Sequence, residues 1–243
     1  NVAPANIRQY LNRSPEGQIS FRYDNKLGIL DGQTFRDLPL PQKTDWMQTF
    51  VWNNQVWTLY QNGLLESEKG DILQLTSFPA GTKSLSARIA FDKTGRLLIA
   101  GNYLVVVNKD LRFFSAGLPY FADNVACDEE NNYWCFTRIG DLLCYRLDGS
   151  GLVLKKKFHD EEISCRYLLH LNKDTFCIGT RSAGIVFAVA NQQYKKLATI
   201  GTGKGISNNF VVDLIRAGNH KLLAATVAGL DLVHFSNSDT TAE

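Results

Sequence analysis

The sequence predicts an all-β protein, a β-propeller built from four-stranded blades. Three observations lead to this prediction: short strand-like segments lie between turn residues, the pattern repeats about every 40 residues, and no amphipathic helical stretch interrupts it. Pro39, Pro79 and Pro119, which are 40 residues apart, mark the repeat. Strands that recur in fours at a long fixed period are typical of propeller blades, whereas the strands of a β-sandwich do not recur in this way.

Each repeat contains a polar turn followed by a short segment rich in β-branched and aromatic residues. Gly and Asn tolerate a positive φ and Asp caps its own backbone, so these residues favour turns. The turns are Ser14–Gly17, Trp52–Asn54, Asp92–Gly95, Glu130–Asn132, Asn172–Asp174 and Ala217–Asn219. The strands expected after them are Ile19–Tyr23, Val56–Tyr60, Leu97–Ala100, Tyr133–Thr137, Thr175–Thr180 and Leu222–Thr226. These segments are too short for helices and read as strands.

Six repeats fill residues 1–243, and we expect one propeller domain over this range. The expected blades are 5–40, 44–80, 84–118, 122–158, 162–200 and 206–243. The last blade is predicted to be incomplete, because the polar segment Ser236–Glu243 is a poor strand. An open ring would expose unpaired strand edges, so we expect the chain to be an excised part of a longer propeller array.

Composition excludes several classes of protein. The 243 residues carry 26 Lys and Arg against 24 Asp and Glu, a net charge of +2, so no strong field attracts nucleic acid. The longest apolar run, Ile185–Ala190, is far shorter than the ~18 residues that a membrane span needs, so we expect no membrane insertion by this segment. Residues 1–5 have neither the basic nor the apolar region of a signal peptide.

No motif for catalysis, metal or cofactor stands out. Gly201–Gly205 lacks the spacing of a phosphate-binding loop, and the four histidines lack the spacing of a zinc site, so we expect no cofactor and no metal. The acidic run His159–Glu162 is expected to be a solvated loop. The Cys135 and Cys177 positions are equivalent in neighbouring repeats, which favours small buried packing residues. A disulfide between Cys135 and Cys144 across the intervening turn stays open.

The later repeats share a sequence motif. It is found in Gly117–Pro119, Asn132–Trp134 and Thr137–Gly140, again in Phe176–Ile185, and again in Gly205–Val211 with Ala225–Leu230. This motif resembles the two-component regulator propeller repeat, whose pattern runs from a Gly-Leu-Pro-type loop to Trp-Ile-Gly-Thr and a Gly-Leu pair. The resemblance covers all six repeats and is clear in the last three. It implies the periplasmic sensor region of a hybrid two-component histidine kinase, with any kinase outside these residues.

The topology of a blade predicts where a ligand binds. The loop between the second and third strands and the loop between blades emerge on the same face, near the central channel. The candidate ligand-binding residues on these loops are Trp46, Asn62, Tyr103, Tyr120, Arg138 and Arg181. Aromatic faces with amide and guanidinium donors suit a sugar or an anionic sugar. The alternative is that the aromatic residues, including Phe121, pack under their own loops.

We therefore expect a non-catalytic sensory propeller that binds an oligosaccharide and changes its packing against neighbouring blades or a second copy of the chain. A protein–protein interaction scaffold is the first alternative, although the paired Gly-His and Trp-Asp signature of WD repeats is missing. A polysaccharide-degrading propeller enzyme is the second; it needs clustered acids or a His–Tyr pair, in which the mapped loops are poor. Lys155–Lys157 is predicted to lie in an outer strand and to protect its edge.

Overall fold

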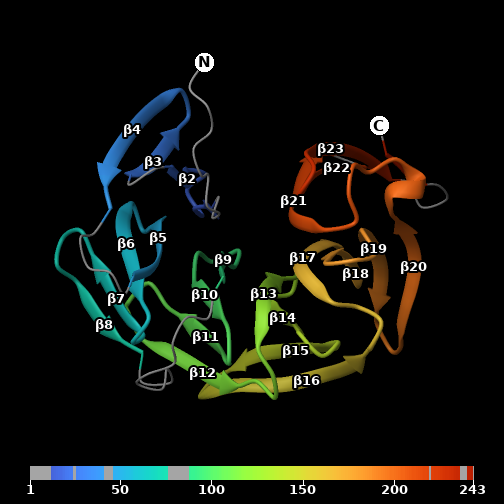
Figure 1. Cartoon of the computed structure of the whole chain (residues 1–243). Coiled ribbons are helices and arrows are strands. Elements are labelled where there is room, and N and C mark those ends of the chain that lie inside the picture. The colour runs from blue at the N-terminus through green and yellow to red at the C-terminus, as the bar shows by residue number, and fades with distance from the viewer. Residues whose placement is uncertain are drawn as a thin grey trace. The chain divides into compact units, whose positions relative to one another are not determined.

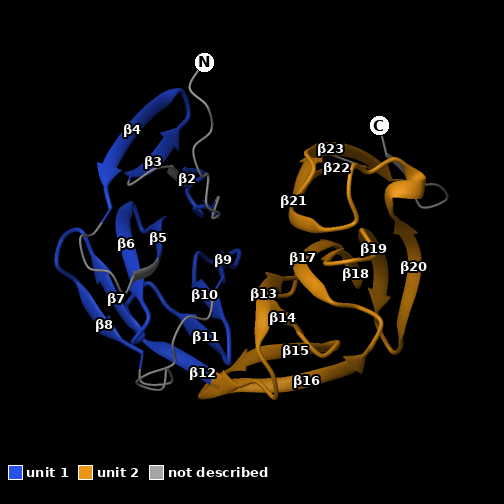
Figure 2. Ribbon diagram, viewed as in Figure 1, with its two compact units in different colours: residues 1–115 blue, residues 116–243 orange. Residues whose placement is uncertain are grey.

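The computed structural model describes residues 12–23, 26–40, 46–75, 88–218, 220–235 and 240–242. Within these ranges the regular elements are all strands, apart from one short 3₁₀ helix at Thr202–Lys204, and turns and loops join them. The chain separates into two compact units, residues 1–115 and 116–243, coloured separately in Figure 2. Each unit carries three four-stranded antiparallel sheets, which are the blades of a β-propeller fold.

The blades of the first unit follow the order of the chain, with each strand paired to the next (Figure 1). The first blade is β1 (Asn12–Arg13), β2 (Ile19–Tyr23), β3 (Lys26–Asp31) and β4 (Thr34–Pro39). The second is β5 (Trp46–Trp52), β6 (Gln55–Tyr60), β7 (Leu64–Ser67) and β8 (Ile72–Gln74). The third is β9 (Arg88–Phe91), β10 (Leu97–Ala100), β11 (Tyr103–Val107) and β12 (Phe113–Gly117).

The second unit has the same order with longer strands. Its first blade is β13 (Ala122–Cys127), β14 (Asn132–Thr137), β15 (Asp141–Asp148) and β16 (Gly151–His159). The next is β17 (Cys165–Asn172), β18 (Thr175–Thr180), β19 (Ile185–Ala190) and β20 (Tyr194–Ile200). The last is β21 (Val211–Gly218), β22 (Lys221–Thr226), β23 (Leu230–Phe235) and β24 (Thr240–Ala242).

The strands and turns expected from the sequence are confirmed. The six predicted strands correspond to β2, β6, β10, β14, β18 and β22, with differences of at most one residue at the first position. Each predicted turn holds a residue in a positive-φ conformation: Gly17, Asn53, Asn54, Gly95, Asn131, Lys173 and Gly218. Lys155–Lys157 lies in β16, the outermost strand of its blade, as predicted.

The prediction that the last blade is incomplete is wrong. Thr240–Ala242 forms β24 and pairs with β23, with Thr240 opposite Phe235 and Ala242 opposite Val233. Polar composition made this segment look unsuited to a sheet. An outer strand faces solvent, however, and two β-branched threonines suit that position.

The hydrophobic core of each unit lies between its blades. In the second unit, Trp134 on β14 packs against Phe176 on β18, with their ring centroids 4.8 Å apart. Cys135 and Cys177 are fully buried, as predicted, but their positions are not equivalent: with Thr137 aligned on Thr180, Cys135 matches Ile178 and Cys177 matches Trp134. In the first unit, Trp52 donates its indole N–H to the backbone oxygen of Gly95 in the next blade at 2.7 Å. Aromatic side chains therefore join neighbouring blades as well as filling them.

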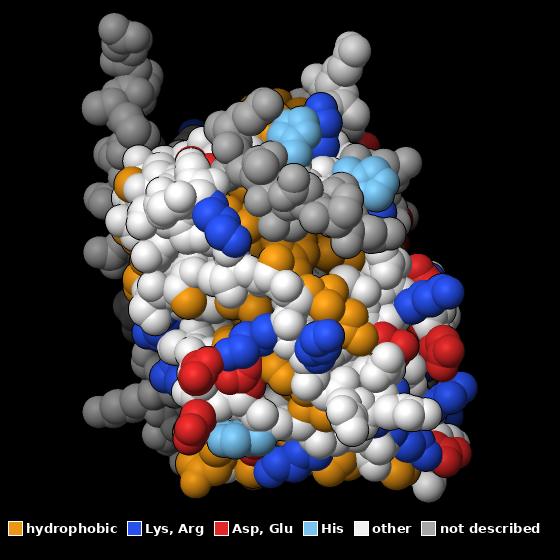
Figure 3. Space-filling view, turned by 90° about the vertical axis from the view of Figure 1, so that its right-hand side faces the viewer, with side chains coloured by type: hydrophobic (Ala, Val, Ile, Leu, Met, Phe, Trp, Pro, Cys, Tyr) orange, Lys and Arg blue, Asp and Glu red, His pale blue; other side chains and the backbone are white. Residues whose placement is uncertain are grey.

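The outer side of the molecule shown in Figure 3 has basic and acidic side chains interspersed, with apolar side chains between them. This face carries no extended field of one charge. Among the described residues, no helix is long and apolar enough to span a bilayer.

Candidate functional site

The turns between the second and third strands are built alike in the three blades of the second unit. The first residue of each turn donates its backbone N–H to the carbonyl of the residue that leads into the inner strand. The pairs are Arg138 to Phe121 at 2.9 Å, Arg181 to Ser164 at 3.1 Å and Val227 to Phe210 at 3.2 Å. The repeat therefore fixes the backbone at these positions and leaves the side chain free to vary.

A β-bulge lies beside each of these turns. The pairing of the inner strand shifts between Ala122 and Asn124, between Cys165 and Tyr167, and between Val211 and Asp213. The extra residues are Asp123, Arg166 and Val212. Because a bulge inserts an extra residue and redirects its side chain, the blades can also differ chemically at these three positions.

Asp123 is the centre of a charged cluster formed by two neighbouring blades. Its carboxylate, only 1% exposed, accepts hydrogen bonds from Nε and Nη2 of Arg138 at 2.9 and 2.8 Å. Nη2 of Arg181, on the next blade, donates to the same carboxylate at 3.3 Å. Nη1 of Arg166 lies 3.6 Å from it. We call these four residues the arginine cluster.

The electrostatics of the cluster keep Asp123 ionised. Burial by itself raises the pKa of this carboxyl group. The hydrogen bond from Arg138 and the positive charges of Arg138, Arg166 and Arg181 outweigh that effect and hold the pKa below its ordinary value. Asp123 is thus a bound counter-ion, with both oxygens occupied by guanidinium groups.

An aromatic side chain completes the site. The guanidinium carbon of Arg138 lies 4.4 Å from the centre of the Phe121 ring, in a cation–π arrangement. Phe121 is 8% exposed, so it packs under its own loop and supports the arginine. Tyr120, one residue earlier, is 54% exposed and offers an aromatic face to solvent.

Three of the predicted site residues belong to this site or adjoin it: Tyr120, Arg138 and Arg181. Asn62 and Tyr103 lie in the other unit; the amide oxygen of Asn62 accepts the N–H of Leu64 at 3.0 Å, which closes its own turn. Tyr103 is partly buried against the core of its unit. The backbone of Trp46 pairs with Tyr60, and its side chain lies outside the described residues.

Sequence reasoning missed Asp123 and Arg166. Both lie in strands, where a sequence pattern predicts core residues, and not in the loops expected to bind a ligand. A signal was present, because aligning the repeats on Thr137 and Thr180 places Asp123 and Arg166 at the same position. Opposite charges at one position of neighbouring repeats indicate an ion pair between blades.

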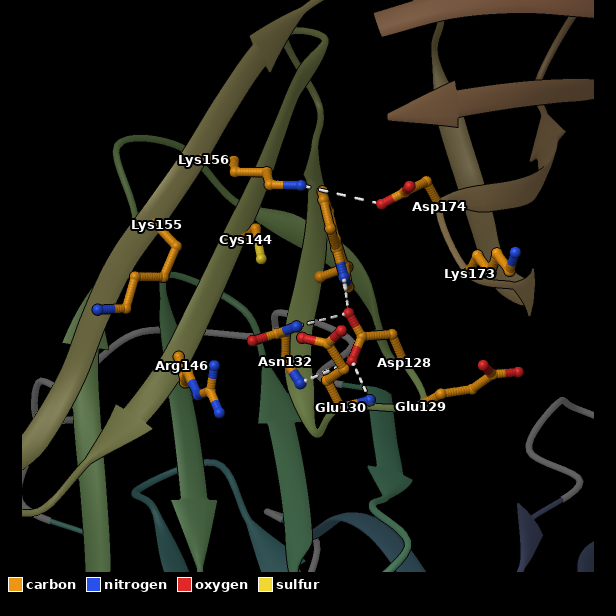
Figure 4. Close-up of a pocket in the computed structure, with 11 residues that line it drawn as sticks. Asp128, Glu129, Glu130, Asn132, Cys144, Arg146, Lys155, Lys156, Lys173 and Asp174 are labelled. Carbon is orange, nitrogen blue, oxygen red and sulfur yellow. Dashed lines mark hydrogen bonds and ion pairs between the residues drawn. The ribbon is translucent and has the colours of Figure 1, made fainter. Parts of the chain in front are cut away.

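A cavity of about 470 Å³ lies at the opposite end of the same strands, between the β13–β14 and β17–β18 turns (Figure 4). Asp128 at its wall accepts the indole N–H of Trp134 and the side-chain amide of Asn132, both at 2.8 Å, so it holds the turn together. Lys156 lies 3.9 Å from Asp174 across the cavity. Basic and acidic groups are balanced around it: Arg146, Lys155, Lys156 and Lys173 face Asp128, Glu129, Glu130 and Asp174.

The cysteines form no disulfide. All five are free thiols, and Cys144 pairs with Trp134 and not with Cys135 in the sheet, so the two sulfur-bearing residues are not cross-strand partners. Among the described residues, no three His, Cys, Asp or Glu side chains are grouped as metal ligands.

Comparison with known proteins shows the fold. No protein-family model and no curated protein matches the sequence. Virginiamycin B lyase from Staphylococcus aureus is similar in structure, with a TM-score of 0.70 and 12% identity over 96% of this chain and 82% of that chain. A chain of the mitotic checkpoint complex has a TM-score of 0.70 at 11% identity, over 97% of this chain and 76% of the other.

An extracellular domain from B. thetaiotaomicron, described as part of a hybrid two-component system, is also similar. Its TM-score is 0.51 at 15% identity, and the match covers 93% of this chain but 38% of that one. These proteins have different roles, so the comparisons support a β-propeller fold without selecting among its functions.

Proposed function

We propose that this chain is a non-catalytic sensory propeller that binds an oligosaccharide, in the periplasmic part of a two-component receptor. The observation that supports it is the convergence of Arg138 and Arg181, from equivalent turns of neighbouring blades, on one buried carboxylate. Side chains that meet where turns of adjacent blades emerge form a natural recognition surface. The sequence motif shared by the last three blades supports the assignment to a two-component receptor.

The chemistry of the site favours binding over catalysis. A glycosidase needs one carboxyl group that keeps its proton and a second that acts as base or nucleophile. Asp123 instead meets guanidinium groups at both oxygens, and its lowered pKa makes it a poor proton donor. The exposed ring of Tyr120 suits stacking against a sugar face, and guanidinium groups suit hydroxyl and acidic substituents.

Thermal unfolding against a panel of neutral and acidic oligosaccharides tests this proposal. A ligand present at about 100 times its Kd stabilises the folded state by about 2.7 kcal/mol. For a chain of this size that raises Tm by roughly 5–10 °C. A saturable rise with any member of the panel supports a sensory ligand-binding role. No rise with any sugar would contradict it.

A protein-interaction scaffold is the second candidate. The last blade carries apolar side chains on its exposed surface, with Val227 62% and Leu230 65% exposed beside the β22–β23 turn. Exposed apolar side chains that lie together favour contact with another protein. Sedimentation of the purified chain across a range of concentrations detects self-association, and Val227→Ser would weaken it.

A further inference from the structure

The arginine cluster carries more positive charge than its own carboxylate neutralises. Arg138 and Arg181 share the single carboxylate of Asp123, which can neutralise only one of their two positive charges. Nε of Arg138 and Nη2 of Arg181 both approach Oδ2 of that carboxylate, at 2.9 and 3.3 Å. Two like charges held this close repel one another, and a second anion beside them relieves the repulsion.

Donors remain for that second anion. Arg138 uses Nε and Nη2 for Asp123, and Arg181 uses only Nη2. Nη1 of Arg138 and both Nε and Nη1 of Arg181 therefore donate no hydrogen bond within the part of the chain that the structure describes. The two side chains are 43% and 40% exposed. A guanidinium group presents its N–H donors in a planar fork that matches the paired oxygens of a carboxylate or a sulfate.

The positive site is confined to two blades. In the last blade the equivalent turn and bulge positions are Val227 and Val212. A polyanion such as nucleic acid needs a continuous basic track, and this surface offers one localised site with an apolar neighbour. A single acidic group on an otherwise uncharged ligand fits better.

We propose that the arginine cluster binds one carboxylate or sulfate group of an acidic oligosaccharide; this inference rests on the proposed function. Arg181 supplies free N–H donors at Nε and Nη1, and Arg138 supplies one further donor at Nη1. Asp123 and the Phe121 ring hold the guanidinium group of Arg138 in place from two sides. Tyr120 lies next in the chain to Phe121, where its ring is open to a neighbouring sugar.

Isothermal titration calorimetry with matched probes tests the proposal. The probes are trigalacturonate, its fully methyl-esterified form, galactose 6-sulfate and galactose, so each acid has a neutral counterpart. The proteins are the unaltered chain, Arg138→Ala, Arg181→Ala, Arg181→Lys and Arg146→Ala. Arg146 is an exposed arginine of the same blade at the cavity of Figure 4, so its variant controls for loss of a surface charge and tests the alternative location.

We expect saturable binding of at least one acid, with the neutral counterpart much weaker. Loss of a hydrogen bond to a charged group corresponds to roughly ten- to a hundredfold in Kd, so both alanine variants should weaken binding by at least tenfold. Arg181→Lys should bind more tightly than Arg181→Ala and less tightly than the unaltered chain, because it keeps the charge and loses the planar set of N–H donors. Arg146→Ala should bind normally. Thermal unfolding of each variant verifies that it is folded.

The two acids distinguish the source of the oxyanion: binding of trigalacturonate alone assigns a carboxylate, and binding of galactose 6-sulfate alone assigns a sulfate. Equal affinity for an acid and its neutral form, unchanged affinity in Arg181→Ala, or no saturable binding of either acid would overturn the inference. If neutral oligosaccharides from the panel stabilise the protein regardless of the arginines, the proposed function stands and this inference fails. If no sugar of either kind binds, both fail.

Discussion

Replacement of Asp123 by Asn removes the charge at the centre of the arginine cluster and nearly preserves the shape of the side chain. The wild-type carboxylate accepts three hydrogen bonds from two arginines and lies 3.6 Å from a third. Asn keeps one acceptor oxygen and turns an N–H₂ group toward a guanidinium group. The variant should therefore lose stability at neutral pH without any loss of packing volume.

The structure sets the size of the effect. Removing one member of a fully buried ion pair costs about 3–5 kcal/mol. Asp123 is buried, but Arg138 and Arg181 are 43% and 40% exposed, so water replaces part of what they lose. We therefore expect a loss of about 2 kcal/mol, since hydrogen bonds to charged groups contribute about 1.5–3 kcal/mol each and Asn retains some of them. For a chain of this length the loss corresponds to a Tm lower by about 4–8 °C.

The pH dependence separates a charge effect from a packing effect. The pKa of Asp123 lies below its ordinary value of 3.8 in the folded protein. Its stabilising contribution is therefore complete above about pH 5 and is lost as the pH falls through the folded-state pKa. The Asn variant has no such titration, so the difference in stability between the two proteins should shrink below pH 4.

Urea unfolding of both proteins between pH 7 and pH 2.5, followed by tryptophan fluorescence, measures this difference. Asp110→Asn is the matched control, because Asp110 pairs with Arg112 at an exposed site and contributes little there. A difference at neutral pH that persists unchanged to pH 2.5 would refute the electrostatic reasoning. So would equal stability of the two proteins at pH 7.

Two further predictions concern the blades themselves. Gly140→Ala should lower Tm by about 4–8 °C, because φ of Gly140 is +91° and a Cβ atom there would lie 2.2 Å from the backbone oxygen of Asp160. Gly151→Ala is the control: its Cβ atom would meet nothing within 4 Å, so Tm should not change in the same melting experiment. In the native protein at pH 8, a maleimide should label Cys127 alone, because the other four thiols are buried and burial raises the pKa of Cys144 to about 12. Mass spectrometry after labelling counts the modified cysteines. Rapid labelling of Cys144 in the native protein would contradict the packing described.

The fold was predictable because a repeat reinforces weak local signals. A turn such as Asp92–Gly95 carries little information alone, but its recurrence at a fixed period indicates a blade. The fourth strand of the last blade was missed for the opposite reason. Thr240–Ala242 is three residues long, too short for its two β-branched threonines to give a strand signal by themselves, and it is a strand because it pairs with the edge of β23.

The site was predictable only in part. Blade topology placed Arg138 and Arg181 on equivalent turns, and the structure brings both to one carboxylate. The partner that joins them was not found, because Asp123 sits in a bulge, and one inserted residue changes which face of a strand a side chain occupies. Residues on the first three blades were selected by the same topology, yet Asn62 hydrogen-bonds within its own turn.

The second unit separates the part of a blade that maintains the fold from the part that is free to specialise. Across its three blades the turn N–H bonds the same carbonyl, and the bulge recurs beside it, whatever side chain is present. Side chains at these two positions contribute to no strand pairing, so exchanging them changes the chemistry of the site without changing the hydrogen bonds of the sheet. Arginine and aspartate at these positions make a charged site on two blades, whereas Val212 and Val227 make the third apolar. A ligand that binds here therefore contacts side chains that differ between blades, and the specificity of the site follows from the order in which the repeats are arranged.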